Sequence, residues 1–265
     1  MIRATIGILA SSAGGFDADA QAFFDRVTTA GGTLSATEQT AINTLVLQMK
    51  ADGIWSKMKA IYPMVGASAA ACAQNLKSSS FTGSFSSGWT FASTGVKNTS
   101  SSGYFETNCN DNNFANNSLS FGCYSRTNIN STAYDLGIYN TSLSRGTWMA
   151  LRNSGTFKGG VQQGVPEVNV SNSDARGFFQ MSKNGSTTVL GYKNSSQVIN
   201  TTSTTTNPTN TTFYLGALNN GGVAAFGFSD REFTFAYIGD GLSGTDMTNY
   251  YTAVQACQTT LSRNV

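Results

Sequence analysis

From about residue 76 onward, the chain consists of short segments in which apolar and polar residues alternate, and Asn, Gly and Ser separate these segments. Residues 119–124 and 233–237 alternate in this way. A period of two places successive side chains on opposite faces of a β-strand. Strands that recur about every ten to fifteen residues, with no helical pattern between them, predict an antiparallel β-sandwich or jelly roll.

Two turns in this region predict β-hairpins. Residues Lys183–Ser186 contain Asn-Gly, a strong hairpin signal, between the apparent strands 178–181 and 187–192. Residues Asn219–Gly222 lie between the apparent strands 213–218 and 223–228. We expect a further strand at 147–152 and a loop or edge strand in the Thr-rich stretch 201–212.

Helical patterns are confined to the two ends of the chain. Residues Asp17–Thr29 have apolar positions on one helical face. Ser35 and Glu38 form a capping-box pattern before a second amphipathic helix that runs to about Lys50. We expect a third helical piece at Ile54–Ile61, which ends ahead of Pro63.

At the C-terminal end, Ser243 and Asp246 form a weaker capping box before an amphipathic helix at 245–261. These patterns predict two parts, an N-terminal helical segment at 1–75 and a β-sandwich at 76–265 that the last helix closes.

The low charge of the chain excludes several classes of function. Only 11% of the residues are charged, the net charge is +2, and the basic residues are scattered, so we expect no nucleic-acid partner. No apolar run of 18 residues occurs, so we expect no membrane span. Residues 1–10 only faintly resemble a signal peptide, and we interpret them as a mature N-terminus.

Four cysteines are too few and too dispersed for a disulfide framework, and without histidine they do not predict a zinc site. Cys109 and Cys123 fall in neighbouring apparent strands. A disulfide across a hairpin and two small buried thiols both stay open, and the buried thiols are the favoured interpretation.

Several stretches resemble structural proteins of bacteriophages and prophages. Near the N-terminus these are Phe16–Phe23, Gln39–Val46 and Ile54–Pro63. Near the C-terminus, Phe213–Gly216, Phe233–Gly241 and Asn249–Gln255 resemble the closing strands and helix of concanavalin A-like (laminin-G-like) domains in the same proteins.

The resemblance implies a concanavalin A-like jelly roll with a lectin-like character, carried on a virion that is assembled in the cytoplasm of the host bacterium. Capsid, head fibre and tail all stay open as its place. The partners implied are other virion proteins and further copies of this chain, and the trimeric fibres and spikes of phages suggest a homotrimer. Trp55 and Tyr62, in the helical segment, are candidate anchors against the sandwich or a neighbouring subunit.

The concanavalin A-like fold also includes glucanases, but the residues argue against an enzyme. Glycosidases use two carboxyl groups about 5–10 Å apart. Asp230 and Glu232 are the only acids of the sandwich two positions apart, and we interpret them, with Arg231 between them, as a solvated strand end. Serine and cysteine triads require a histidine, which this chain lacks.

Calcium is the cofactor that related lectin-like domains suggest. The segment Asn108–Asn113 offers oxygen ligands, with Asn110 and Asp111 as the candidate metal ligands. A single carboxylate holds calcium weakly, and an Asx-rich turn explains the segment equally well. No other cofactor is expected.

A glycan site requires aromatic side chains near amides and hydroxyls. The candidates are Trp148, Tyr192 and Asn194, and the further tyrosines are Tyr104, Tyr124 and Tyr139. Two hypotheses follow. The favoured one is a non-enzymatic virion structural protein, and the alternative is a carbohydrate-binding adhesin that recognises host surface polysaccharide.

Overall fold

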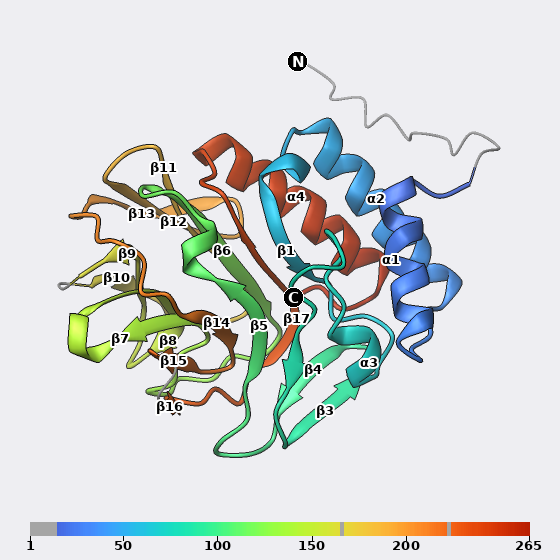
Figure 1. Cartoon of the computed structure of the whole chain (residues 1–265), viewed down its shortest axis with the longest axis horizontal. Coiled ribbons are helices and arrows are strands. Elements are labelled where there is room, and N and C mark those ends of the chain that lie inside the picture. The colour runs from blue at the N-terminus through green and yellow to red at the C-terminus, as the bar shows by residue number, and fades with distance from the viewer. Residues whose placement is uncertain (1–14, 165–166, 222–223) are drawn as a thin grey trace.

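The computed structural model describes residues 15–164, 167–221 and 224–265. In this part of the chain two β-sheets, A and B, face each other, and three helices lie along one side of the sandwich (Figure 1). The predicted fold class is confirmed. The protein is mainly β, a jelly-roll-like sandwich of antiparallel sheets with N-terminal helices and a C-terminal helix.

Sheet A is antiparallel throughout its described strands. In spatial order it contains β13 (Ser196–Thr202), β12 (Thr188–Lys193), β11 (Gly177–Asn184), β6 (Ser118–Ser125), β17 (Glu232–Gly239), β4 (Gly95–Asn98) and β3 (Trp89–Ala92), and β1 (Met58–Tyr62) also pairs with β17.

Sheet B is antiparallel except where β15 pairs with β7. In spatial order it contains β10 (Val168–Ser171), β9 (Thr156–Gln163), β8 (Arg145–Asn153), β7 (Leu136–Asn140), β14 (Thr212–Leu215), β5 (Phe105–Asn110) and β2 (Ser84–Phe85), and β15 (Leu218–Asn220) pairs with β7 and with β16 (Ala224–Phe226).

The first predicted hairpin forms, and the second forms with other bounds, since Asn219 and Asn220, expected in its turn, belong to β15. β11 and β12 pair across the Asn-Gly turn, and β15 pairs with β16 across the second turn. Gly222 and Val223 of that second turn lie outside the described residues. The apparent strand 213–218 divides in two, because β14 pairs with β5 and β7 before the chain turns back into β15.

Two apolar cores lie on the two sides of sheet A. Alternation along β6 places Leu119, Phe121 and Cys123 between the sheets, as its pattern predicts. The next residue, Tyr124, faces the helices and is also buried. Sheet A is therefore covered on both faces, while none of the described helices covers the outer face of sheet B (Figure 1).

The helices that cover sheet A are α1 (Ala18–Thr29), α2 (Ala36–Ala51) and α4 (Gly244–Thr260), and the shorter helical turns are α3 (Ala69–Cys72), η1 (Trp55–Lys57), η2 (Asp111–Asn113) and η3 (Thr141–Leu143). Capping boxes begin α2 at Ser35 and α4 at Ser243, as predicted. No helix in the described part of the chain is long and apolar enough to cross a membrane.

The predicted helical piece at Ile54–Ile61 is wrong. Only one turn, η1, is helical there, and β1 follows and pairs with β17. A short apolar run fits a buried strand as well as a helix. Here the strand is favoured because it can pair with the free edge of β17. The N-terminal segment thus supplies a strand to the sandwich, and the division of the chain at residue 75 stays a prediction.

The cysteines are buried free thiols in the structure. Cys109 lies on β5 of sheet B and Cys123 on β6 of sheet A, so they do not face each other across a hairpin. Burial raises the pKa of the Cys109 thiol to about 12. The interpretation of residues 1–10 concerns residues outside the described part of the chain.

Candidate functional site

A cluster of aromatic side chains lies on the uncovered face of sheet B. On β8, Met149 and Leu151 point into the core, so Trp148 and Ala150 point outward. Gly137 of β7 is the partner of Trp148 in the ladder, and a Cβ atom there would lie 2.5 Å from the Trp148 Cβ. The lack of a side chain at Gly137 therefore leaves the space that the Trp148 side chain needs.

Tyr134 reaches the cluster from the segment before β7, and Phe226 reaches it from the end of β16. The Tyr134 ring lies 5.1 Å from that of Trp148 and 5.6 Å from that of Phe226, both edge to face. The Tyr134 amide donates a hydrogen bond of 2.8 Å to the Gly227 carbonyl. A Cβ atom at Gly227, whose φ is +66°, would lie 2.4 Å from Tyr134 Cδ2, so glycine is required for this packing.

These rings enclose a cavity of about 240 Å³, which we call the aromatic cavity. Glu167 is exposed at its border and forms an ion pair with Lys158, with 3.3 Å between Nζ and Oε1. An apolar concavity with few polar groups is typical of a small-ligand site. Its lining residues are Tyr134, Tyr139, Trp148, Gln163, Gly164, Glu167, Leu218 and Phe226.

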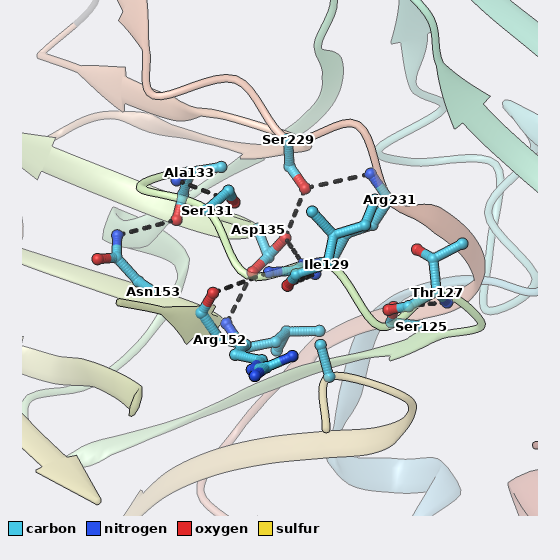
Figure 2. Close-up of polar contacts among 12 residues, drawn as sticks. Ser125, Thr127, Ile129, Ser131, Ala133, Asp135, Arg152, Asn153, Ser229 and Arg231 are labelled. Atoms are coloured by element: carbon cyan, nitrogen blue, oxygen red, sulfur yellow. Dashed lines mark hydrogen bonds and ion pairs between the residues drawn. The ribbon is translucent and has the colours of Figure 1, made fainter. Parts of the chain in front are cut away.

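A buried ion pair joins the segment before β7 to the segment between β16 and β17 (Figure 2). Arg231 Nε donates to Asp135 Oδ1 at 2.8 Å, and both side chains are fully buried. The same carboxylate accepts hydrogen bonds from the Ser229 hydroxyl at 2.6 Å and the Leu151 amide at 2.7 Å. Asp135 follows Tyr134 directly, so this network fixes the backbone from which the Tyr134 ring projects.

A second hollow adjoins the aromatic cavity, and we call it the hydroxyl-lined groove. It has a volume of about 780 Å³ and lies between the edge strands β10 and β13. Gln163, Gly164 and Glu167 border both hollows. The remaining lining residues are Val168, Asn169, Val170, Val198, Ile199, Asn200, Thr201, Thr202, Ser203, Thr204 and Thr206.

The structure separates the predicted glycan residues. Trp148 lies on the outer face of sheet B, whereas Tyr192 packs beneath α4 on the opposite side of the sandwich, with its hydroxyl donating to Gln197 Oε1. Asn194 directly follows β12, and its side-chain oxygen accepts a hydrogen bond of 2.9 Å from the Phe178 amide of β11. The core separates the faces on which Trp148 and Tyr192 lie, and glycan binding by each of the three candidates stays a prediction.

The further tyrosines also have different surroundings. Tyr139 lines the aromatic cavity, as its candidacy requires. Tyr104 stacks on Tyr214 with 4.3 Å between the ring centroids, and Tyr124 donates from its hydroxyl to Gln255 of α4.

The predicted calcium ligands have protein partners. Asp111 is buried, and its carboxylate accepts hydrogen bonds from the amides of Thr209 and Thr211 and from the Thr209 hydroxyl. Asn110 Oδ1 accepts from the Asn112 amide at 2.9 Å. These contacts are those of an Asx-rich turn that holds the segment before β14. Calcium at this place stays a prediction.

The predicted docking residues differ in exposure. Tyr62 is fully buried, and its hydroxyl lies within hydrogen-bond distance of the carbonyls of Phe81 and Thr107, so it packs against the sandwich, the first of its two predicted alternatives. The Trp55 side chain is 8% exposed, and the Lys77 ammonium lies 4.4 Å from its ring centroid. Docking of a partner through Trp55 stays a prediction.

Sequence reasoning missed Tyr134, Phe226, Glu167 and the role of Arg231. Tyr134 precedes its strand in an irregular segment, and Phe226 belongs to a short strand that follows a glycine-rich turn. Arg231 lies fully buried rather than at a solvated strand end, while its neighbour Glu232 pairs with Arg126. The glycines at 137 and 227 were the available signals, since each marks a place where another group approaches the backbone closely.

The fold and the site define a jelly-roll-like sandwich with one helix-covered sheet and one open sheet that bears an aromatic cavity. No family model matches the sequence, and no curated protein matches it. Similarity to solved structures is found in the fold.

Domain 4 of AbnA, a GH43 extracellular arabinanase from Geobacillus stearothermophilus in complex with arabinotriose, aligns with 73% of this chain and 98% of that one, at 13% identity and a TM-score of 0.51. A structure of botulinum neurotoxin type C, whose cell entry is described as dependent on two ganglioside molecules, aligns over 77% and 53%, at 12% identity and a TM-score of 0.53.

Trypanosoma rangeli sialidase in complex with sialic acid aligns over 79% of this chain and 38% of that one, at 8% identity and a TM-score of 0.52. This chain thus spans about half of the neurotoxin structure and less of the sialidases, including 24% of the NanB sialidase of Streptococcus pneumoniae. At these identities the similarity is one of fold.

Proposed function

We propose that this protein binds carbohydrate and that the ligand enters the aromatic cavity on the outer face of sheet B. The observation that carries the proposal is the convergence of Tyr134, Tyr139 and Trp148 around one open hollow. Sugar rings present apolar C–H faces between their hydroxyl groups, and aromatic side chains offer such faces a flat apolar surface. Glu167 at the border adds an acceptor for sugar hydroxyls.

The similar structures support the same class of ligand. Arabinotriose, sialic acid and gangliosides are the sugar-containing molecules named for the three proteins above. We therefore prefer the carbohydrate-binding hypothesis to a purely structural role.

A glycan array probed with the full chain tests the proposal, followed by calorimetric titration with the best-bound glycans. Replacing Trp148 or Tyr139 with alanine should weaken binding at least about tenfold, because a truncated central aromatic typically costs a binding site more than 1 kcal/mol. Tyr139 is half-buried at the site, which makes its variant safer for folding than that of Trp148.

Tyr104→Ala is the matched control, since Tyr104 stacks on Tyr214 and lines neither hollow. Equal affinity in the Tyr139, Trp148 and Tyr104 variants would overturn the placement of the site. Failure to bind any glycan on the array would overturn the function.

We propose recognition without hydrolysis. Glu167 is the carboxylate among the described residues that line the two hollows, and it is paired with Lys158, whereas glycosidases generally use two carboxyl groups. New reducing ends released from a bound polysaccharide would contradict this proposal.

Display of the domain on a virion, alone or as a homotrimer, stays a prediction from the resemblance to phage proteins. Mass spectrometry of purified particles tests it, with a known minor virion component as the detection control. Absence of the protein from such particles would contradict it.

A further inference from the structure

The charge and extent of the two hollows select among carbohydrates. Resting on the proposed function, we propose that the ligand is a neutral oligosaccharide that extends from the aromatic cavity into the hydroxyl-lined groove. The proposal concerns ligand class and length, which the aromatic cavity by itself leaves open.

The extent of the site follows from shared residues. Gln163, Gly164 and Glu167 border both the cavity of about 240 Å³ and the groove of about 780 Å³. A ligand that fills only the smaller hollow would leave the larger one unused at its side. Ligand sites for larger molecules commonly reach several hundred Å³. The aromatic cavity alone is smaller than this, and the adjoining groove supplies the remaining volume.

The lining of the groove suits a chain of sugar units. Val168, Val170 and Val198 are half-buried and pack against the sandwich core, so they form an apolar floor. Amide and hydroxyl side chains surround this floor, among them Asn200 and Thr202, which are exposed. An apolar floor with neutral donors and acceptors on its sides matches a molecule with apolar ring faces and hydroxyl edges.

The charge of the site opposes acidic sugars. Glu167 is the only ionised side chain among the described residues that line either hollow, and no lysine or arginine lines them there. Two lysines contact residues of the lining from outside it. Lys158 lies 3.3 Å from the Glu167 carboxylate, and the buried Lys183 donates to the Ser203 backbone carbonyl at 3.3 Å. Binding of a sugar carboxylate favours Arg or Lys donors, and a carboxylate at the border repels it instead.

Titration calorimetry with two matched sets of probes tests the proposal. The first set pairs lactose with 3′-sialyllactose, and likewise compares each neutral array hit with its sialylated form. The second set is a ladder of one to six units of the arabinose, maltose and cellobiose series. We expect neutral forms to bind at least about tenfold more tightly than sialylated ones, and affinity to rise at least about tenfold along one ladder.

Variants connect these outcomes to the two hollows. Glu167→Arg should reduce the preference for neutral forms, whereas Asp25→Arg, the same change in charge on an exposed position of α1, should leave it unchanged. Asn200→Trp, which fills the groove, should remove the dependence of affinity on ligand length. Ser195→Trp is its control, since Ser195 is exposed in the β12–β13 turn and lines neither hollow.

The failures are distinguishable. Binding of no glycan at all would overturn the proposed function. Glycan binding that depends on Tyr139 but shows no dependence on length, or tighter binding of sialylated forms, would leave the proposed function in place and overturn this inference.

Discussion

Asp135 and Arg231 form an ion pair whose two side chains are completely buried (Figure 2). Besides the carboxylate, Arg231 donates to the carbonyls of Ile129 and Arg152, at 2.6 and 3.2 Å. The pair thus connects the segment before β7, the end of β8 and the segment before β17. In the sequence these residues lie about a hundred positions apart, so a local pattern presents Arg231 only as a charge between two acids.

Replacing Arg231 with methionine should lower the free energy of unfolding by about 3–5 kcal/mol, because it leaves the Asp135 carboxylate buried without its cation. Urea denaturation measures this change. Arg176→Met is the control, since the Arg176–Asp174 pair is exposed and its loss should change stability little. Equal effects in the two variants would contradict the structural role given to the buried pair.

At the scale of elements, the β15–β16 hairpin and the loop before β7 complete the aromatic cavity. Leu218 of β15 packs with Trp148 and Ala150, and Phe226 of β16 packs against Tyr134. Gly227 follows β16 directly, and a Cβ atom at this position would lie 2.4 Å from Tyr134 Cδ2. The hairpin therefore shapes the site around Trp148 of β8.

Gly227→Ala should weaken glycan binding at least about tenfold, because the new methyl group displaces the Tyr134 ring. Gly155→Ala is a matched control: its φ of +80° carries a similar backbone strain, but nothing lies within 4 Å of the added Cβ. Both variants should lose stability, and only the first should lose binding. If both retain the affinity of the parent protein, Tyr134 does not contact the ligand.

The capping box of α4 is an element that local sequence describes well. The Ser243 hydroxyl accepts a hydrogen bond from the Asp246 amide, and the Asp246 carboxylate accepts one from the Ser243 amide at 2.8 Å. Lys57 also pairs with this carboxylate at 2.8 Å, which attaches the start of α4 to the segment before β1.

Ser243→Ala should reduce the free energy of unfolding by about 1 kcal/mol, the usual value of an N-cap. Thr252→Ala, at an exposed position of the same helix, should be neutral or slightly stabilising, since alanine is the better helix former. Thermal unfolding followed by circular dichroism compares the two variants, and a larger loss for Thr252→Ala would contradict the importance of the cap.

On the scale of the whole molecule, the two cores hold many weakly acidic groups in their neutral form. Burial raises the pKa of the Cys72 and Cys109 thiols to about 12 and that of Cys257 to about 11. It raises the pKa of further buried groups as well: Cys123, Tyr62, Tyr237 and Tyr250.

Stability should therefore be constant up to about pH 9 and fall steadily from there to pH 11. In this window the unfolded chain releases protons, at its ordinary pKa of 9.0 for thiols and 10.0 for phenols, that the folded chain retains. Three lysines act in the opposite sense, because burial lowers the pKa of Lys183 to about 8 and also lowers the pKa of Lys77 and Lys193, but they stand against the seven buried thiols and phenols named above.

Thermal unfolding at pH 7.5, 9, 10 and 11 with a reducing agent present measures this dependence. A melting temperature that stays constant or rises between pH 9 and 11 would contradict the burial of these groups.

Several features of the fold follow from the sequence alone. The alternation in β6 and β17, the Asn-Gly hairpin and the two capping boxes are all set by neighbours within a few positions. The helix predicted at Ile54–Ile61 is wrong because an apolar run of that length fits a helix or a buried strand equally well. Strand β17, with which β1 pairs, lies about 180 positions further along the chain.

Periodicity and turn chemistry act between near neighbours in the chain, so they are enough to specify a mainly β sandwich with helical ends. Long-range packing, in contrast, brings the described helices onto sheet A and leaves the outer face of sheet B without them. It also placed Trp148 and Tyr192 on opposite faces, and gathered Tyr134, Tyr139, Trp148 and Phe226 around one cavity. Such a site depends on which strands become neighbours and on which face of a sheet each side chain lies. Both are determined by the burial of apolar surface across the whole molecule.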